Sequence, residues 1–532
     1  MEKILQSMEL EDLCGQLLCY EISPKDDPKV IDQLFQKIRP GGIFVANMTA
    51  EQIKLFTDIA NKYTKVPVIV AGDVESGPGS AIVGESLLPH HMSCGACDDV
   101  ELVEQAAEET AKITRKNGIH WTLSPVADIN INPNNPVVNN RAIADSPAQV
   151  AKIGTAMIRG MQKNGYLMCS CKHFPGDGVD DRNQHFCTSI NSLSFEDWMD
   201  SFGYVYKEMI REKTASIMAA HIALPSYDGE YDEIKGYKPS VLSRKLITGL
   251  LKGELGFDGC VVSDAMSMIG ACAMTDLDRL AVEFINAGGD MVLFPEDGDF
   301  DLIRQAVIHG EISLERIRDA VSRILKMKER ARLFEDQEQV KAEIQWGDFQ
   351  AVADKIGEKS IKIVRNTREL VPLKIKQGGK ILLVNIQRSE QKQQSYIRCL
   401  DELERELNAR GYETKSLVNP RHTAIKEIMD DYDCILVNCK MSSQDYPGGS
   451  LRAGWEHFMA LWRGYILKHP KMIFTSFGDP YKLYEFPFLH TYINAFSYAE
   501  STQRGFVKVL LGEVEATAKS PVALPGFFDR EV

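Results

Sequence analysis

The chain has 532 residues, enough for two or more domains with a large core. Hydrophobic residues make up 44% of it and charged residues 26%, which is typical of a globular protein in water. The formal net charge of −14 argues against nucleic acid or an anionic membrane surface as the main partner, and leaves a neutral substrate open.

The N-terminal residues 1–21, MEKILQSMELEDLCGQLLCYE, predict an amphipathic helix. Acidic residues stand where a secretory signal needs an apolar core. No apolar run reaches the roughly 18 residues that a membrane-spanning helix needs. The 12 cysteines are scattered, as in proteins of a reducing compartment. We therefore expect a cytoplasmic protein without a membrane partner.

Strand and helix patterns alternate over the first two-thirds of the chain. Amphipathic patterns that end at glycine, such as residues 99–118 and 146–165, predict helices between the strands. The buried strands are predicted at residues 41–47, 66–73, 120–128, 167–174, 215–222, 259–266 and 290–296. Repeated βα units of this number predict a (β/α)8 barrel.

A second set of α/β patterns follows the barrel. Residues 313–343 and 349–365 predict helices, and apolar runs then begin a further sheet. These runs lie at residues 380–386, 433–440, 471–480 and 491–501. We predict a barrel domain with the catalytic site at residues 1–340, a helical linker at 341–365 and a second α/β domain at 366–532.

Polar side chains gather where the predicted barrel strands end. They are Asp73, Asp128, Lys172, His173, His221 and Asp264. Chemistry in such barrels occurs at the C-terminal ends of the strands. Taken singly, Asp264 and Asp73 are explained as helix N-caps, a lone lysine as a surface charge and a lone histidine as a packed side chain. Together they supply acceptors, cationic donors and a candidate nucleophile, which suits a polyhydroxylated ligand such as a sugar.

The segment HHMSCGAC suggests a metal site at His90, His91, Cys94 and Cys97. A second C-x-x-C pair is missing, and adjacent histidines rarely reach one ion together. We therefore favour packing and a turn over zinc. Cys169 and Cys171 alternate as on a strand and are expected to fill the core. No metal and no cofactor are expected.

Three stretches resemble glycoside hydrolase family 3, and in particular its β-N-acetylglucosaminidase branch. They are LSPVADININPNNPVVNNRAIADSPAQV, KHFPGDGVDDRNQH and GFDGCVVSDAMSM. The second matches a Lys-His-Phe-Pro-Gly segment with a loop that ends in histidine, and the third matches the nucleophile segment. The C-terminal FTSFGDPYKL and SPVALP resemble the α/β sandwich of two-domain members. The resemblance implies a (β/α)8 barrel followed by this sandwich.

This resemblance implies a retaining double displacement on a terminal β-linked N-acetylglucosamine. Asp264 matches the nucleophile, and His185 matches the acid/base that most retaining glycosidases take from a carboxylate. A neutral histidine does not repel an anionic acceptor, so a phosphorylase is the alternative activity. The resemblance does not specify whether the sugar comes from a peptidoglycan fragment, a chitooligosaccharide or a host glycan.

Four more residues are carried over from the family. Asp73, Arg141, Lys172 and His173 match residues that grip the terminal N-acetylglucosamine. We expect Asp128 to hold the mouth of the barrel instead. The loop that carries His185 must swing over the bound sugar, and its glycines at 176 and 178 are the expected hinges.

The chain departs from the family pattern in three places. Ala81 stands where arginine is common, and Asp177 replaces a frequent histidine. Asn183 stands where the family has the aspartate of an Asp–His dyad. An amide hydrogen-bonds His185 but adds no negative charge, and it is able to select the wrong ring tautomer.

Two explanations for Asn183 follow. We favour a substitution introduced to inactivate the enzyme and trap a ligand; the other is a natural member with altered activity. Asn183 also keeps open a sugar-binding pseudoenzyme that retains the four sugar contacts. The intact Asp264 and His185 favour an enzyme. A β-glucosidase is less favoured, because such members generally lack the histidine loop.

Overall fold

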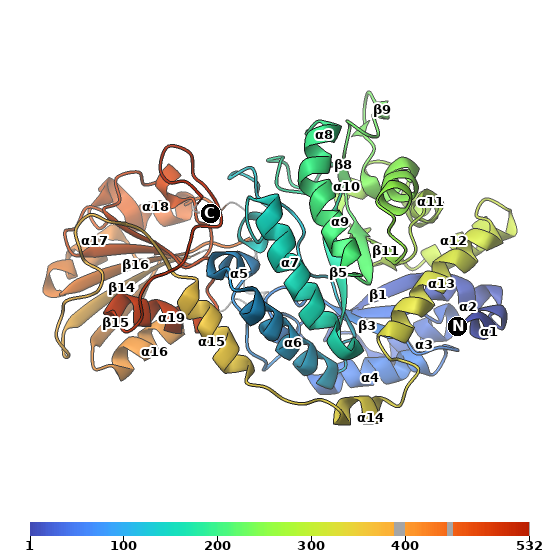
Figure 1. The fold of residues 1–532 in the computed structure, drawn as a ribbon, viewed down its shortest axis with the longest axis horizontal. Helices are drawn as coiled ribbons and strands as arrows, with labels where there is room; N and C mark the ends of the chain where they lie inside the picture. The colour runs from blue at the N-terminus through green and yellow to red at the C-terminus, as the bar shows by residue number, and fades with distance from the viewer. Residues whose placement is uncertain (388–399, 444–450, 531–532) are drawn as a thin grey trace.

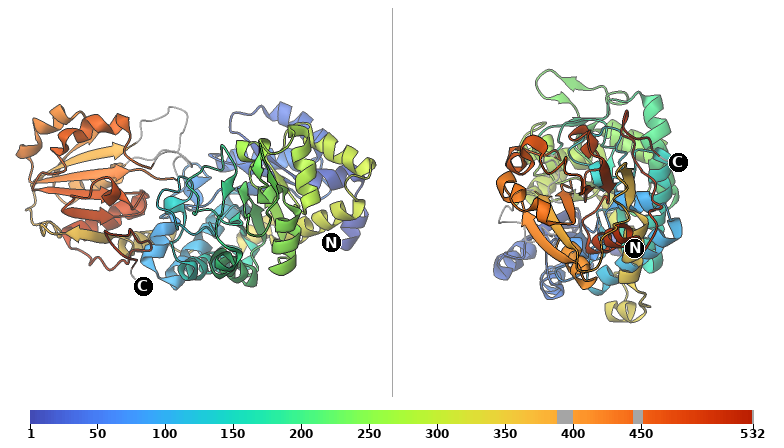
Figure 2. Two further views of the ribbon diagram at one scale, coloured as in Figure 1. Left: turned by 90° about the horizontal axis from the view of Figure 1, so that it is seen from above. Right: turned by 90° about the vertical axis from the view of Figure 1, so that its left-hand side faces the viewer.

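The computed structural model describes residues 1–387, 400–443 and 451–530. Figure 1 shows an elongated molecule in which a barrel lies beside a smaller sheet domain, and the turned views in Figure 2 show the same two bodies. Within the described residues, no helix is both long and apolar enough to span a bilayer.

The barrel contains the expected parallel strands and one more. In chain order they are β1 (Leu18–Ile22), β2 (Gly42–Val45), β3 (Ile69–Gly72), β4 (Trp121–Thr122), β5 (Met168–Phe174), β7 (Ser216–Ala219), β11 (Cys260–Ser263) and β12 (Val292–Leu293). The order around the sheet is β11-β7-β5-β4-β3-β2-β1-β12. A parallel bridge between Val262 and Met291 brings the two ends of this order together. The predicted barrel fold is confirmed.

The prediction of one helix over residues 1–21 is wrong. The chain forms α1 (Glu2–Gln6) and α2 (Leu10–Gln16), and then turns into β1. Four of the five residues of β1 are buried. A strand covered on both faces reads as a continuous apolar run, and a short run of this kind does not distinguish strand from helix.

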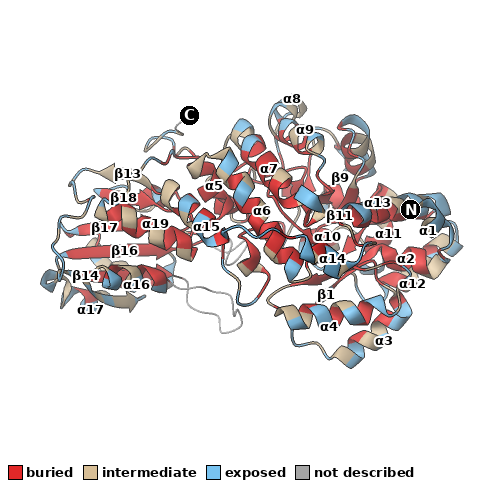
Figure 3. Ribbon diagram, turned by 60° about the horizontal axis from the view of Figure 1, so that its bottom comes forward, coloured by how far each residue is buried: buried red, intermediate tan, exposed pale blue. Residues whose placement is uncertain are grey.

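Helices cover the outside of the barrel, with their buried faces turned inward and their exposed faces outward (Figure 3). Local signals set their ends. Thr49 and Gln52 form a reciprocal capping box at α4 (Ala50–Asn61). Proline occupies the first turn of α7 (Pro147–Gln162), where its missing N–H costs nothing. The other principal barrel helices are α3 (Pro28–Ile38), α6 (Val100–Lys116), α9 (Tyr204–Arg211), α11 (Leu280–Ala287), α12 (Asp299–Ile308) and α13 (Leu314–Arg330).

The second domain is an α/β sandwich around one mixed sheet. Its strands are β13 (Lys362–Asn366), β14 (Lys380–Gln387), β15 (Glu413–Val418), β16 (Cys434–Lys440), β17 (Met472–Ser476) and β18 (Thr491–Asn494). Only β13 runs antiparallel to its neighbour. Alternate residues of β14 enter two separate cores, Ile381 on one face and Leu382 on the other. Helices cover both faces, including α16 (Asp401–Ala409) and α19 (Glu500–Leu511) on one and α17 (His422–Lys426) and α18 (Trp455–Leu461) on the other (Figure 1).

The helix expected over residues 349–365 ends early. The structure has α15 (Phe349–Lys359), and β13 begins three residues later. All five residues of the segment KIVRN are intermediate in burial, as suits an edge strand, and pairing with β18 outweighs the helical pattern.

The two domains share part of their packing. Met92 and Ala96 lie on α5 (His91–Cys97), which belongs to the barrel by sequence. Their side chains join a core cluster of the second domain. Leu87 joins the cluster on the other face of the sheet. Side chains from the barrel part of the chain therefore pack into the core on each face of the second domain's sheet.

A buried carboxylate ties together the seam between β11 and β12. Asp290 is fully buried and accepts hydrogen bonds from Lys252 Nζ at 2.9 and 3.0 Å and from the Val261 amide at 2.8 Å. The Arg316 guanidinium also pairs with it. These partners come from three different elements, so one side chain holds the seam closed.

We predict that Asp290→Ala lowers the free energy of unfolding by about 3–5 kcal/mol, because two largely buried cations lose their shared partner. Urea denaturation followed by circular dichroism measures the change. The matched control is Asp319→Ala, which removes a half-exposed partner of the same Arg316. It should cost less than about 1 kcal/mol. Equal losses in the two variants would contradict the proposed role of Asp290.

Candidate active site at the strand ends

The candidate nucleophile follows β11 directly. Asp264 is nearly buried, and its Oδ1 accepts a hydrogen bond from the Ala265 amide at 2.8 Å. Burial opposes its ionisation, but the nearby His221 and His173 and the Ala265 amide outweigh burial and hold the pKa of Asp264 below its usual value. The carboxylate is thus ionised at neutral pH, as a nucleophile must be.

A cluster of two cations and two acids lies beside it. Lys172 Nζ is 2.9 Å from Asp73 Oδ1 and 2.6 Å from Glu75 Oε1. Arg141 binds Glu75 through two parallel bonds of 2.9 and 2.6 Å. The structure therefore brings three of the predicted sugar-binding residues together, since Asp73 follows β3 and Lys172 lies on β5.

Glu75 is the member that sequence reasoning missed. Its side chain is 1% exposed. Burial alone would raise its pKa, but Arg141 and Lys172 hold the pKa of Glu75 well below its usual value. The Asp73 side chain, by contrast, is 43% exposed and remains open to a ligand. The available signal for Glu75 was its position two residues after Asp73, in the turn that follows β3.

Asp128 holds His173 through both its ring and its backbone amide. The ring Nδ1 lies 2.6 Å from Asp128 Oδ2, and the His173 amide donates to Asp128 Oδ1 at 3.1 Å. The amide of Asp177 donates to the same oxygen at 2.7 Å. Asp128 therefore orients His173 and anchors the start of the following loop. Burial, and next the charge of Asp128, raise the pKa of Asp177 to about 7.

The loop after β5 presents His185. The Asn183 amide oxygen accepts a hydrogen bond from the His185 backbone N–H at 3.0 Å and lies 2.7 Å from ring Nδ1. The His185 carbonyl accepts from the Ile269 amide at 3.1 Å, which ties this loop to the segment that follows Asp264. Residues 183 and 185 are thus in contact, as a dyad requires.

These two bonds decide the tautomer of His185. A backbone N–H only donates, so the atom of Asn183 that faces it is the oxygen. The same oxygen faces Nδ1, so this ring nitrogen carries the hydrogen and Nε2 is left with its lone pair. The tautomer is the one that an aspartate would select. The concern that the amide selects the wrong tautomer does not apply in this geometry.

What Asn183 does not supply is negative charge. Burial lowers the pKa of His185 to about 4, although Asp264 acts in the opposite direction. The imidazole is therefore neutral at pH 7.

Positions 176 and 178 require glycine both because of their backbone conformation and because neighbouring atoms leave no room for a Cβ atom. Both have positive φ, at 120° and 102°. A Cβ atom at Gly176 would lie 2.1 Å from the ring of Phe202, and one at Gly178 would lie 2.0 Å from the Ile129 carbonyl oxygen. Any larger residue would push the His185 loop away from the barrel. Their role as hinges stays a prediction.

The residues of HHMSCGAC hold a neighbouring loop. His91 Nδ1 donates to the Arg141 carbonyl at 2.9 Å, and His90 Nδ1 accepts from Asn140 Nδ2 at 2.9 Å. The described part of the chain contains no group of three or more His, Cys, Asp or Glu side chains arranged to hold a metal ion. Ala81 is buried and presents only a methyl group where an arginine was expected.

The sequence matches a known family over most of the barrel. Residues 9–327 fit the model of the glycosyl hydrolase family 3 N-terminal domain. A Cellulomonas fimi protein described as "Beta-N-acetylglucosaminidase/beta-glucosidase" is 28% identical, with 97% of this chain and 94% of that protein covered.

Solved structures extend the similarity to both domains. One described as "Beta-glucoside phosphorylase BglX bound to 2FGlc" is 28% identical with a TM-score of 0.87, covering 98% of this chain and 95% of that one. A family 3 β-N-acetylglucosaminidase from Paenibacillus sp. is 24% identical with a TM-score of 0.85, over 99% of this chain and 100% of that one, and shares the fold. With the barrel, the polar strand ends and the family match together, this chain belongs to glycosyl hydrolase family 3 and is a glycoside hydrolase.

Proposed function

We propose that the enzyme removes terminal β-linked N-acetylglucosamine through a covalent intermediate on Asp264, with His185 as acid and base. One observation carries this proposal. The ionised Asp264 follows β11, and the loop that bears His185 is hydrogen-bonded to the segment just after Asp264. The Cellulomonas fimi relative, and others described as β-hexosaminidases, support the choice of sugar.

In the first step, an Asp264 oxygen attacks the anomeric carbon and forms an ester bond to the sugar. The bond from that carbon to the leaving oxygen breaks, and His185 Nε2 gives its proton to the oxygen. In the second step, water attacks the anomeric carbon, and the ester bond returns its electrons to Asp264. His185 Nε2 takes a proton from the water.

The cluster beside Asp264 would bind the sugar hydroxyls. Asp73 offers an exposed acceptor, while Lys172 and Arg141 are fixed donors whose charge Glu75 partly balances. His173 is oriented by the fully buried Asp128, which fixes the direction of its second ring nitrogen.

The amide at position 183 weakens the first step most. With a pKa of about 4, only about one His185 in a thousand is protonated at pH 7. Substrates with poor leaving groups need that proton. Activated aryl glycosides need it much less.

A second candidate is transfer of the sugar to phosphate. Two solved structures described as β-glucoside phosphorylases are 28% identical to this chain and cover 98% of it. In the intermediate, Asp264 is an uncharged ester, and both His185 and Asn183 are neutral at pH 7. A phosphate oxygen would attack the anomeric carbon as the ester bond breaks, and no proton need be removed. An anionic acceptor is therefore not repelled.

We predict that Asp264→Ala lowers kcat by more than about 10⁴-fold while the thermal unfolding curve stays close to that of the parent. The substitution removes the attacking oxygen and the hydrogen bond that Asp264 Oδ1 accepts from the Ala265 amide. Incubation with a fluorinated N-acetylglucosaminide, followed by peptide mass spectrometry, should find the label on Asp264. A label on another carboxylate, with Asp264 unmodified, would remove it from this role.

We predict that Asn183→Asp raises kcat/KM on an N-acetylglucosamine disaccharide at pH 7 by about 10²–10⁴-fold. The active form needs ionised Asp264 and protonated His185. In the parent, activity should therefore rise as pH falls from 7 towards 4. A carboxylate at 183 raises the pKa of His185 and moves this limb to higher pH.

The measurement is kcat/KM from pH 4 to 8 on the disaccharide and on an aryl glycoside, which should gain less. The matched control is Asp180→Asn, on the same loop. Asp180 bonds the Ile190 amide and pairs with Arg182 instead of His185. Coincident pH profiles for the parent and Asn183→Asp would contradict a dyad role for residue 183.

Product analysis distinguishes the activities. An aryl β-N-acetylglucosaminide is incubated with and without inorganic phosphate, and the sugar products are identified by mass spectrometry. Hydrolysis predicts free N-acetylglucosamine in both samples, whereas the phosphorylase predicts the sugar 1-phosphate when phosphate is present. Binding without any product, in the parent and in Asn183→Asp alike, would contradict both and favour a sugar-binding pseudoenzyme.

A further inference from the structure

The loop that carries Arg141 lies between the two domains. It leaves β4 and reaches α7, and the turn η2 (Asn139–Arg141) forms its tip. Arg141 itself points back into the barrel, where it binds Glu75. The two residues just before it point the other way, into the second domain, and both are fully buried.

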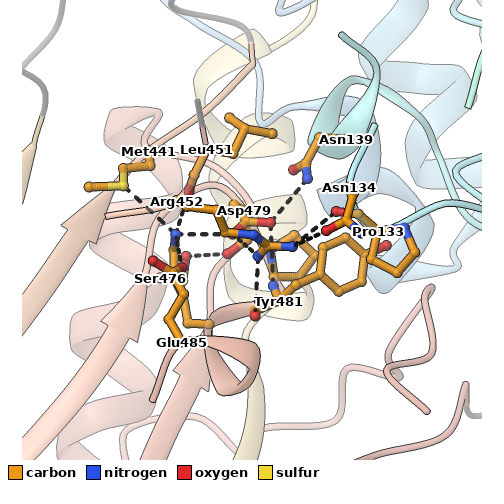
Figure 4. A network of polar contacts seen from close by, with 12 residues as sticks. Pro133, Asn134, Asn139, Met441, Leu451, Arg452, Ser476, Asp479, Tyr481 and Glu485 are labelled. Carbon is orange, nitrogen blue, oxygen red and sulfur yellow. Dashed lines mark hydrogen bonds and ion pairs between the residues drawn. The ribbon is translucent and has the colours of Figure 1, made fainter. Parts of the chain in front are cut away.

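Asn139 is bound by the second domain through one carboxylate. Its Nδ2 donates to Asp479 Oδ1 at 3.0 Å (Figure 4). Its own Oδ1 accepts from the Asn140 amide at 2.8 Å. The backbone at Asn139 has φ of 40°, a conformation that asparagine tolerates better than most residues. The side chain is therefore locked at both ends while the backbone makes a tight turn towards Arg141.

Asp479 is itself held by two cations. Lys482 Nζ lies 3.0 Å from Asp479 Oδ2, and Arg452 Nη1 lies 3.3 Å from the same oxygen. Lys482 and Asp479 are both fully buried. Arg452 also donates to Asn134 Oδ1 at 3.1 Å, farther back along the loop. The second domain thus presents a fixed acceptor whose position does not depend on solvent.

Asn140 is bound even more completely. Its Nδ2 donates to His90 Nδ1 at 2.9 Å and to the Phe496 carbonyl at 3.1 Å. Its Oδ1 accepts from Ser442 Oγ at 3.0 Å and from Ser443 Oγ at 3.1 Å. These four contacts occupy both the nitrogen and the oxygen of the Asn140 amide. Three of the four partners belong to the second domain. An amide whose donors and acceptor are all bound in this way is held in one orientation.

We propose that the second domain completes the sugar pocket by fixing Arg141, with Asp479 and Ser443 as positioning residues that act through Asn139 and Asn140. This inference rests on the proposed function only in taking Arg141 as a sugar contact. It explains why two adjacent asparagines of the loop, Asn139 and Asn140, bind the second domain. We call the contacts of Asn139 and Asn140 with Asp479, Ser442, Ser443, Phe496 and His90 the clamp. His90, which the sequence suggested as a metal ligand, is part of this clamp.

The test uses the full-length protein and three variants. Asn139→Asp keeps the shape of the side chain but places a second carboxylate oxygen about 3 Å from Asp479 Oδ1. Ser443→Ala is milder and removes one hydroxyl from the clamp. The matched control is Asp145→Asn, at the far end of the same loop. It weakens an interdomain contact to Arg530 that does not involve Arg141.

KM and kcat are measured for each variant on an aryl β-N-acetylglucosaminide. We expect Asn139→Asp to raise KM about tenfold to a hundredfold, because small displacements of a positioning group have effects of this size. Ser443→Ala should raise KM less, Asp145→Asn should not change it, and kcat should change little. If Asn139→Asp does not fold, Ser443→Ala decides. A KM within twofold of the parent in every folded variant would overturn the proposal.

Two further measurements separate this inference from the proposed function. The double variant Asn139→Asp with Asp479→Asn reverses donor and acceptor, and it should lower KM towards the parent value. A folded double variant that keeps the raised KM would count against the Asp479 link. If the parent does not turn over N-acetylglucosaminides at all, the proposed function fails. Hydrogen exchange at residues 138–142 then decides: faster exchange in Asn139→Asp than in Asp145→Asn supports the clamp, and equal exchange overturns it.

Discussion

One buried carboxylate, Glu75, makes the arrangement of the strand ends possible. Arg141 and Lys172 come from different parts of the barrel, and both are almost without solvent. Without Glu75, Arg141 would lose its carboxylate partner and Lys172 would keep only Asp73, and a buried cation without a partner is costly. Glu75 binds both of them, so they remain charged and close to Asp264. The loop that carries Arg141 must then come to Glu75, and the second domain lies where it holds that loop in place.

The balance of charge around His185 sets what the site does well. The Asn183 oxygen selects the same ring tautomer as a carboxylate would, so the geometry of a dyad is kept without its charge. The cost falls on protonation of the leaving group. The benefit is that His185, Asn183 and the esterified Asp264 carry no negative charge when the acceptor attacks the intermediate. In the proposed function, slow hydrolysis of unactivated glycosides and tolerance of an anionic acceptor would therefore have one physical cause.

Much of the barrel and the core of the site could be predicted, because each buried strand is an apolar run that ends in a polar side chain. Asp264 and Lys172 were found in this way. The first strand, β1, was mistaken for helix because its burial on both faces removes the alternation that marks a strand. Glu75 and the clamp at Asn139 were missed, since their partners lie 66 and 340 residues away and only the docked loop brings them together.

The central claim is that His185 is neutral at pH 7, with its hydrogen on Nδ1, because burial lowers its pKa and the amide that faces it adds no negative charge to oppose that effect. Nuclear magnetic resonance of the protein with ¹⁵N-labelled histidine measures both properties directly, and a His185→Gln sample assigns the signal. The account predicts an Nδ1–H tautomer with a pKa of about 4, and a higher pKa for the same ring in Asn183→Asp. A pKa near 6.5 in the parent, or a hydrogen on Nε2, would contradict it.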